Sequence, residues 1–346
     1  MTTQFAEVGG VENVVQSLAA ELSQEHEVDL ITRDRPQNTD NMPEDFSSVH
    51  VLEGTESYLG FLRKCRSFLR ENQDKYDVFH FHNWSTILPA AGLDINSVLT
   101  THGTTFDVQA SSGNYLRASL YWMLEETAFN IPDRLTSVTK SHLEPFKIQP
   151  PVDIIRNGVD TDKYSPGETQ EKSDKFEILI VGKHNQAKNH PTLIQAVSEL
   201  ENTKLLIPSD GPLTEQLKTQ ANKLGVDAEF SGRVSEHQLI HLYRRADLFC
   251  LPSKNEGLPL SMLESLSCGT PVLVSDVGDN DAIMEESNAG ATLKSTEAKH
   301  VRSGIKHTRQ QGLESMSDRA RKYATGNLDW EQIANRYEEA FGSVHR

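Results

Sequence analysis

The sequence is poor in cysteine and in basic side chains, and it has no long hydrophobic run. Its three cysteines, Cys65, Cys250 and Cys268, are too few and too widely spaced for a disulfide framework or a metal site. No uncharged stretch reaches the ~18 residues that a membrane-spanning helix needs. The first residues also lack the basic-then-apolar layout of a signal peptide. These absences favour a reducing compartment, and we expect a cytoplasmic protein.

Positive charge is scarce over the whole chain. The 346 residues include 34 basic and 50 acidic side chains, which gives a formal net charge of −16. A surface with this excess of acid repels phosphate, so a general nucleic-acid-binding protein is disfavoured. No Gly-x-Gly-x-x-Gly follows a predicted strand, which disfavours a dehydrogenase with a dinucleotide cofactor. The length is enough for about two domains, each with its own core.

Short apolar runs alternate with helical periodicity, a pattern typical of parallel α/β layers. In the first half, strands are predicted over 27–32, 78–82, 97–101 and 134–138. After a polar stretch over 165–175, interpreted as a linker, strands are predicted over 177–181, 204–207, 248–251 and 271–275. The sequence therefore predicts an α/β fold with two doubly wound domains, 1–160 and 161–328, followed by a helix within 329–346.

Ligands of open parallel sheets bind at the carboxyl ends of the strands, so the loops there are the first candidates for a site. The strand ending at Val181 is followed by Gly182-Lys183 and then by Lys188, just before a predicted helix. Two lysines at a helix start could neutralise a diphosphate. The alternative is a pair of solvated loop lysines. The turn that contains Gly211 follows the next strand in a similar way, but such turns occur in many proteins.

The segment 252–264 is the most informative part of the chain. Gly257 lets the backbone approach a ligand closely, and Pro259 can begin a helix whose free N–H groups face an anion. Glu264, one to two turns into that helix, could accept hydrogen bonds from the two hydroxyls of a ribose. Glu256 could meet a second polyol or a developing positive charge. This pair suits a nucleotide-sugar, although two glutamates at this spacing are also common in structural segments.

Taken together, these motifs resemble those of the retaining GT-B glycosyltransferases of family four, over nearly the whole chain. The segments that carry the resemblance are 9–12, 80–84, 101–103, 157–160, Lys183 with Lys188, and 256–264. The resemblance implies a GT-B fold, in which two Rossmann-like domains face a central cleft and the helix in 329–346 crosses back to the first domain. It also implies a hexosyltransferase-type reaction, from a nucleotide diphosphate-sugar to a glycan or lipid-linked acceptor, with no metal or other cofactor.

The resemblance also implies roles for single residues. Glu264 would bind the donor ribose, and Glu256 would contact the transferred sugar. His102 would approach that sugar from the first domain, and Gly10 would lie beside the donor phosphates or the acceptor. The catalytic set is thus Glu256, His102, Lys188 and Lys183. The other donor-binding positions are Gly182, Gly211, Val234 beside the base, and the backbone N–H groups of Gly257 and Leu258, which would hold the diphosphate with the two lysines.

The chain departs from the family pattern at several places. Lys183 stands where arginine is usual, and Asn189 and Ser209 replace glycines, which leaves the identity of the donor open. Only 1–6 remain for the first central strand, so that strand is short or the recorded start lies downstream of the real one. Two rival functions therefore stay open: a non-catalytic nucleotide-sugar-binding partner subunit, and a nucleotide-sugar epimerase of the same fold.

A cluster of basic residues interrupts the acidic first half. Arg63, Lys64, Arg66 and Arg70 lie on the predicted helix around Leu62. Most such clusters form a solvated helix face. The alternative is peripheral contact with an anionic membrane, such as its inner face, where a lipid-linked acceptor would be found.

Overall fold

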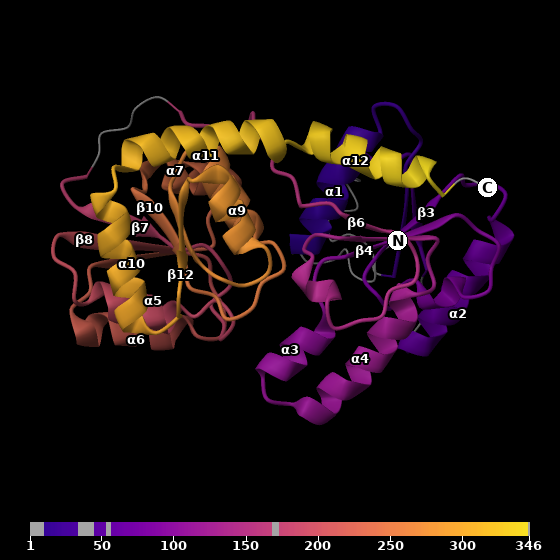
Figure 1. The fold of residues 1–346 in the computed structure, drawn as a ribbon, viewed down its shortest axis with the longest axis horizontal. Helices are drawn as coiled ribbons and strands as arrows, with labels where there is room; N and C mark the ends of the chain where they lie inside the picture. The colour runs from indigo at the N-terminus through magenta and orange to yellow at the C-terminus, as the bar shows by residue number, and fades with distance from the viewer. Residues whose placement is uncertain (1–9, 34–44, 53–56, 168–172, 345–346) are drawn as a thin grey trace. The chain divides into compact units, whose positions relative to one another are not determined.

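The computed structural model describes residues 10–33, 45–52, 57–167 and 173–344. The chain divides into two units, one formed by the residues up to Asn157 together with those from Trp330 onward, and the other by Gly158–Asp329. Each unit has its own parallel sheet and its own core (Figure 1). The α/β class that the sequence predicts is therefore confirmed.

The first unit is built on a parallel sheet of four strands in the order β3-β4-β5-β6, and β1 and β2 form a separate parallel pair. The strands predicted over 78–82, 97–101 and 134–138 are confirmed to within one residue at each end. The strand expected over 1–6 lies outside the described residues. The elements of this unit are α1 (Gly10–Leu22), β1 (Asp29–Thr32), β2 (Ser48–Val51), α2 (Tyr58–Glu71), β3 (Phe79–His82), η1 (Leu88–Ala90), β4 (Ser97–Thr101), α3 (Thr105–Ser111), α4 (Tyr115–Phe129), β5 (Arg134–Ser137), η2 (Ser141–Leu143), β6 (Val152–Ile154) and α12 (Trp330–Gly342).

The last helix of the chain belongs to the first unit. There α12 packs against α1, and the rings of Tyr337 and Phe341 lie 5.3 and 5.1 Å from the ring of His80 on β3. Arg336 donates a hydrogen bond to the carbonyl oxygen of Ile154 at the end of β6, at 2.6 Å. The helix therefore closes over residues that are far from it in the sequence.

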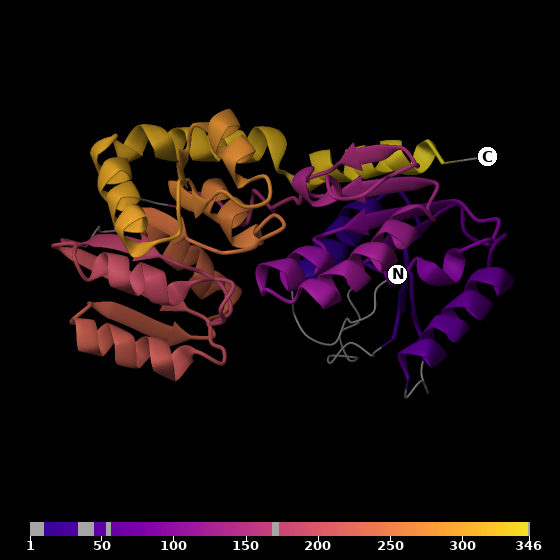
Figure 2. The same cartoon turned by 60° about the horizontal axis from the view of Figure 1, so that its bottom comes forward.

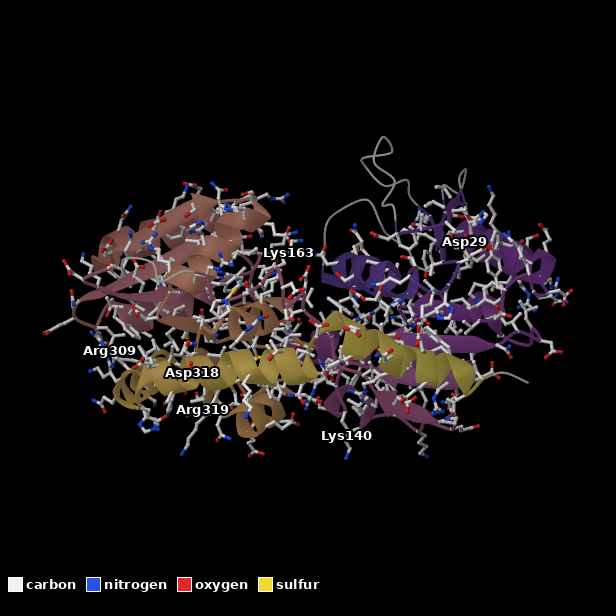
Figure 3. The ribbon with its side chains drawn as sticks, turned by 90° about the horizontal axis from the view of Figure 1, so that it is seen from above. Asp29, Lys140, Lys163, Arg309, Asp318 and Arg319 are labelled. Carbon is white, nitrogen blue, oxygen red and sulfur yellow. The ribbon has the colours of Figure 1, made fainter. Side chains whose placement is uncertain are left out.

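A polar cluster ties the β1-β2 pair to the chain that leads into β3. Asp29, labelled in Figure 3, accepts a hydrogen bond from the hydroxyl of Tyr76 at 2.7 Å and lies 3.3 Å from Nε2 of His50. Burial alone would raise the pKa of Asp29, but hydrogen bonds from Tyr76, Ser48 and His50 lower it to about 2. The carboxylate is therefore charged at neutral pH and ties the β1-β2 pair to the segment that precedes β3.

The second unit has one parallel sheet of six strands, in the order β12-β11-β10-β7-β8-β9. The order reverses between β7 and β10, which is the doubly wound arrangement that the sequence predicts. Helices cover the sheet (Figure 2). Of these, α5 contacts α6 and α10, and α11 contacts α8 and α9. The elements are β7 (Phe176–Leu179), α5 (His190–Val197), β8 (Thr203–Pro208), α6 (Thr214–Leu224), β9 (Ala228–Gly232), α7 (Glu236–Arg245), β10 (Leu248–Leu251), α8 (Leu260–Ser267), β11 (Val272–Ser275), α9 (Asn280–Ser287), β12 (Gly290–Leu293), α10 (Ala298–Gln310) and α11 (Leu313–Asn327).

Local signals in the sequence begin several helices of this unit. The side chain of Ser235 caps α7 by accepting from the backbone N–H of Gln238, whose own side chain accepts from the N–H of Ser235, so the predicted capping box is confirmed. Pro191 lies in the first turn of α5, as predicted. The helix predicted from Pro259 begins instead at Leu260, with Pro259 as its N-cap.

The polar stretch predicted as a linker starts inside the second unit. Along the chain, the first unit passes into the second between Asn157 and Gly158. The carbonyl oxygen of Ser165 accepts a hydrogen bond from Arg244 on α7 at 2.6 Å. The hydroxyl of Ser267 on α8 donates to the carbonyl oxygen of Tyr164. These bonds hold the start of the stretch against the helices, while 168–172 lie outside the described residues.

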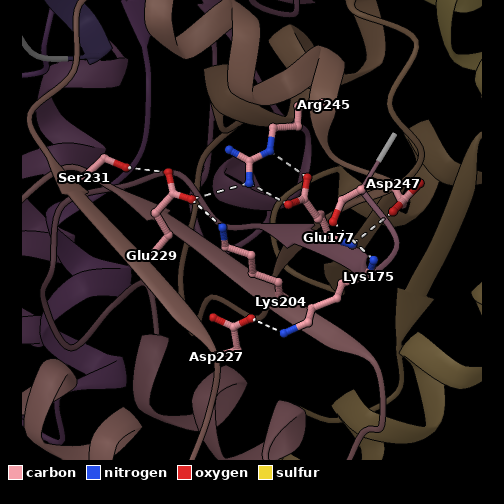
Figure 4. Close-up of polar contacts among 9 residues, drawn as sticks. Lys175, Glu177, Lys204, Asp227, Glu229, Ser231, Arg245 and Asp247 are labelled. Carbon is pink, nitrogen blue, oxygen red and sulfur yellow. Dashed lines mark hydrogen bonds and ion pairs between the residues drawn. The ribbon is translucent and has the colours of Figure 1, made fainter. Parts of the chain in front are cut away.

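The amino ends of the strands of the second unit carry a network of ion pairs (Figure 4). Arg245, at the end of α7, makes two short hydrogen bonds to the buried carboxylate of Glu177, at 2.5 and 2.7 Å. Glu229 on β9 contacts both Arg245 and Lys204, at 3.4 and 2.7 Å. Each of the three strands β7, β8 and β9 contributes one charged side chain, so the network joins neighbouring strands at this edge.

Candidate active site

The predicted donor residues gather where the strand order of the second unit reverses. Lys188 follows β7 and Glu256 follows β10, the two strands on either side of the reversal. Nζ of Lys188 donates to Oε1 of Glu256 at 2.6 Å, and these side chains are only 21 % and 10 % exposed. Ligands of doubly wound sheets bind at such a reversal, at the carboxyl ends of the strands. The structure therefore brings a cation and an anion from two loops together at the expected place.

Hydrogen bonds to backbone carbonyl oxygens hold the two loops together. The N–H of Lys254 donates to the carbonyl oxygen of Ala187 at 2.8 Å, and the side-chain amide of Asn189 donates to the carbonyl oxygen of Pro252 at 3.1 Å. Asn189 has a left-handed backbone with φ 57°, which asparagine tolerates better than most side chains. Asn189 thus adopts a left-handed backbone and adds a bond between the loops.

Two close backbone contacts explain glycines around the site. A Cβ atom on Gly211 would lie 2.7 Å from the carbonyl oxygen of His184, so the turn after β8 packs directly against the loop after β7. A Cβ atom on Gly278 would lie 2.1 Å from the carbonyl oxygen of Gly257, which joins the loops after β11 and β10. Ser209 has φ 85°, so this residue too has a left-handed backbone, which glycine adopts more readily. Four neighbouring loops are therefore packed at the carboxyl edge.

Glu264 lies on α8 and is held by a tyrosine from another helix. Its Oε2 accepts a hydrogen bond from the hydroxyl of Tyr243 on α7 at 2.6 Å. Burial of the carboxyl raises the pKa of Glu264 to about 7, against hydrogen bonds from Tyr243 and Tyr164 that lower it. At neutral pH this carboxyl is therefore divided between its charged and neutral forms, so small changes around it alter its charge.

The remaining predicted residues of the second unit lie along the same set of loops. Lys183 is exposed, Gly182 and Gly257 are half-buried, and Leu258 is buried directly before α8. A Cβ atom on Gly182 would lie 3.1 Å from the side chain of Lys188, so this glycine leaves room for the lysine stem. Val234 is half-buried in the connection between β9 and α7.

His102 and Gly10 belong to the first unit. Gly10 is the exposed first residue of α1. His102 follows β4, and its Nε2 lies 3.1 Å from Nδ1 of His82, with the two rings stacked at 5.4 Å. Burial lowers the pKa of His102 to about 4, so its ring is neutral at neutral pH. Its Nδ1 is buried without a hydrogen-bond partner. The structure thus holds a neutral ring there, with one nitrogen against His82 and the other buried.

Neither a metal centre nor a membrane span is found in the described parts of the chain. No three or more His, Cys, Asp or Glu side chains gather there in a way that could hold a metal ion. Nε2 of His80 instead lies 2.6 Å from the hydroxyl of Thr100. None of the helices in the described ranges is both long and apolar enough to cross a bilayer.

Two residues of the site were not found by sequence reasoning. Tyr243 is one of the apolar-face residues of an amphipathic helix, and only the fold reveals that its hydroxyl meets Glu264. His82, at the end of β3, is the other, and its ring meets His102, which directly follows the neighbouring strand β4. Adjacent parallel strands place their carboxyl ends side by side, and this was the one signal that could have paired the two histidines.

Comparison with known proteins identifies two family models that together cover most of the chain. The model described as Glycosyltransferase Family 4 matches residues 8–163, and the model described as Glycosyl transferases group 1 matches residues 163–326. Their junction lies close to the start of the second unit. The residues Lys183, Lys188, Glu256 and Glu264 all fall within the second of these matches.

Curated relatives share about a quarter of their residues with this chain. Glycogen synthase of Mycobacterium tuberculosis is 24% identical over 293 residues, which is 78% of this chain and 69% of the relative. The O-antigen biosynthesis glycosyltransferase WbnH of Escherichia coli is 27% identical over 301 residues, or 84% of each chain. A Campylobacter jejuni N-acetylgalactosaminyltransferase, whose name specifies an undecaprenol diphosphate-linked acceptor, is 27% identical over 277 residues, or 75% of this chain and 73% of its own.

Solved structures share the fold at lower identity. Sucrose-phosphate synthase from Thermosynechococcus elongatus superposes with a TM-score of 0.85 at 19% identity, covering 99% of this chain and 96% of that one. Anabaena HepE, solved in complex with UDP and glucose, gives a TM-score of 0.80 at 16% identity, covering 99% and 98%. The likeness extends over the full length of these proteins and identifies the architecture.

Proposed function

The chain belongs to the group 1 glycosyltransferases and has the GT-B fold, and from this premise we propose that it transfers a sugar, with retention, from a nucleotide diphosphate-sugar to a glycan or lipid-linked acceptor. The observation that carries the proposal is the contact of Lys188 with Glu256 at the strand reversal. A cation for a diphosphate and a carboxylate for a sugar meet there at one point, which is what transfer from a nucleotide-sugar needs.

Lys188 can serve both groups at once. An ammonium has three N–H donors, so Lys188 can donate to a phosphate oxygen and keep its bond to Glu256. Lys183 is exposed on the same loop and would add a second positive charge. Charge that develops on the departing diphosphate is then stabilised by these lysines and by the N–H groups of Gly257 and Leu258. We expect no bound metal, because the lysines supply the charge.

The reaction exchanges one bond at the anomeric carbon of the donor sugar. The bond from this carbon to the diphosphate oxygen breaks, and the acceptor oxygen forms a bond on the same face of the ring. The proton of the acceptor hydroxyl passes to the departing phosphate oxygen. Glu256 would stabilise the positive charge that develops on the sugar, and the neutral ring of His102 would bind a sugar hydroxyl. Glu264 would accept hydrogen bonds from both hydroxyls of the donor ribose.

The acceptor class is supported by the relatives. The name of one specifies an undecaprenol diphosphate-linked glycan, and that of another specifies O-antigen biosynthesis, so a glycan or lipid-linked acceptor fits these relatives.

Peripheral contact with an anionic membrane through α2 stays a prediction. Arg66 donates to the carbonyl oxygens of Pro89 and Ala91, while Arg63 and Arg70 are exposed. Flotation with anionic vesicles tests it, and equal flotation with neutral vesicles would contradict it.

Nucleotide binding tests the donor site directly. The protein is titrated with UDP, GDP and ADP, and at least one should bind and raise its melting temperature. Lys188→Met should weaken that nucleotide about tenfold or more, because it removes a charge-assisted hydrogen bond. Lys218→Met, at an exposed lysine of α6, is the matched control and should bind as the wild type does. If none of the three nucleotides binds the wild-type protein, the proposed donor site is wrong.

A further inference from the structure

Tyr243 is fixed in position before it meets Glu264. The residue is fully buried, and its ring lies 6.2 Å from the ring of Tyr164 and 6.1 Å from that of Phe249. Its carbonyl oxygen accepts a hydrogen bond from the hydroxyl of Thr270 at 2.6 Å. Both the ring and the backbone are therefore constrained, so the hydroxyl has little freedom to turn away from the carboxylate.

The contact joins two helices through one pair of atoms. Tyr243 comes from α7 and Glu264 from α8, and the hydroxyl lies 2.6 Å from Oε2. A carboxylate that binds the two hydroxyls of a ribose must keep a defined rotamer, because both bonds depend on the plane of the carboxyl group. A rigid donor on one oxygen supplies that constraint.

We propose that Tyr243 is a positioning residue for the nucleotide donor, which holds the Glu264 carboxylate in the orientation that accepts a ribose diol. This inference rests on the proposed function, because it assigns the ligand of Glu264. Tyr243 touches the carboxylate and acts on the nucleotide only through it. The bond therefore contributes to donor affinity and to its dependence on pH.

Several groups set the charge of Glu264. Burial raises its pKa to about 7, and the hydrogen bond from Tyr243 is the largest of the effects that lower it. From the other elements packed around it, Glu236 raises the pKa, and Tyr164 and Lys163 lower it; Lys163 is labelled in Figure 3. Cys268, at the end of α8, also faces the carboxyl, and its thiol is neutral because burial raises its pKa to about 12. Loss of the Tyr243 hydroxyl therefore raises the pKa of Glu264 and leaves less carboxylate at neutral pH.

Tyr243→Phe is the direct test, because it keeps the ring and removes only the hydroxyl. Affinity for the nucleotide found among UDP, GDP and ADP is measured with the full chain from about pH 5 to about pH 9. We expect about tenfold weaker binding at pH 7, and a midpoint of the pH dependence that moves to higher pH. A variant that matches the wild type in affinity and midpoint overturns the inference.

Tyr323→Phe is the matched control. The hydroxyl of Tyr323 on α11 donates to Oε2 of Glu286 on α9 at 2.6 Å. The variant therefore loses a tyrosine–glutamate hydrogen bond of equal length in the same unit. Its nucleotide affinity and pH midpoint should stay those of the wild type. An equal shift in both variants would mean that the effect arises from general loosening of the unit, and would overturn the specific role of Tyr243.

A second measurement needs no nucleotide and separates this inference from the proposed function. Carbon-13 labelling of the glutamate carboxyls reports the pKa of Glu264, which should rise in Tyr243→Phe. If Tyr243→Phe does not fold, 3-fluorotyrosine placed at position 243 keeps the shape and makes the hydroxyl a stronger donor. The pKa should then fall. An unchanged pKa overturns the inference. Failure of all three nucleotides to bind the wild type, with a shifted pKa, overturns the ribose role together with the proposed function.

Discussion

The two edges of the sheet in the second unit use charged side chains in different ways. The amino edge holds a network of ion pairs among Arg245, Glu177, Glu229 and Lys204 (Figure 4). Within it, Nε and Nη2 of Arg245 donate to the two carboxylate oxygens of Glu177. At the carboxyl edge, Lys188 meets Glu256 through one contact between single atoms. The amino-edge charges satisfy each other, whereas the ammonium of Lys188 retains capacity for a further partner.

The two edges also differ in the partners of their carboxyls. Glu177 at the amino edge is 1% exposed and has a bidentate arginine. Glu264 at the carboxyl edge has a neutral tyrosine instead, and burial raises its pKa to about 7. A tyrosine hydroxyl carries no charge, so the charge of Glu264 still depends on its surroundings, including a bound ligand. We therefore expect substitutions at the amino edge to change stability, and substitutions at the carboxyl edge to change ligand binding.

The largest expected effect is at the carboxyl edge. Glu256→Ala should lower the rate of sugar transfer by roughly 10²–10³-fold, because it removes a charge that stabilises the developing positive charge of the sugar. Nucleotide affinity should stay the same or increase, because Lys188 loses its contact with Glu256 and can turn to the phosphate. The first effect is measured as transfer from, or slow hydrolysis of, sugar nucleotides that carry the nucleoside diphosphate found to bind, and the second by calorimetry with that nucleotide.

The exposed residue Glu215 provides the control for this substitution. Its side chain is 85% exposed and pairs with Lys218 one turn along α6, so Glu215→Ala should leave both rate and affinity unchanged. A Glu256→Ala protein that transfers sugar within about tenfold of the wild-type rate would contradict the catalytic role. Normal nucleotide binding with no transfer by the wild type itself would instead favour the non-catalytic partner subunit.

Much of the fold could be predicted because buried parallel strands are nearly continuous apolar runs. Strands such as 97–101 and 248–251 were predicted to the residue. Strand β6 was not, because it has three residues and none is buried. The helix α4 was also missed, since exposed apolar side chains such as Leu116 and Met123 remove the contrast between its faces. Short or evenly apolar segments take their structure from neighbours that the sequence does not show.

The site could be predicted in its residues but not in its contacts. Lys188, Glu256 and Glu264 follow from motifs and from their positions after strands, and the packing of their loops follows from the strand order. The partner of Glu264 does not, because Tyr243 is one of several apolar positions on α7 and only packing selects it. The left-handed backbones of Asn189 and Ser209 are likewise a property of the folded loops, which the sequence does not show.

The smaller expected effect is at the amino edge, and it concerns stability alone. Glu177→Gln should lower the free energy of unfolding by about 2 kcal/mol, because it leaves the partly buried guanidinium of Arg245 without its main carboxylate. Urea unfolding measures the loss, and Glu215→Gln, which breaks an exposed pair, should cost no more than about 0.5 kcal/mol. Nucleotide affinity should not change. Arg245 and Tyr243 lie two residues apart on α7, so a loss of affinity in Glu177→Gln would mean that the two edges are coupled through this helix and would contradict the division of roles.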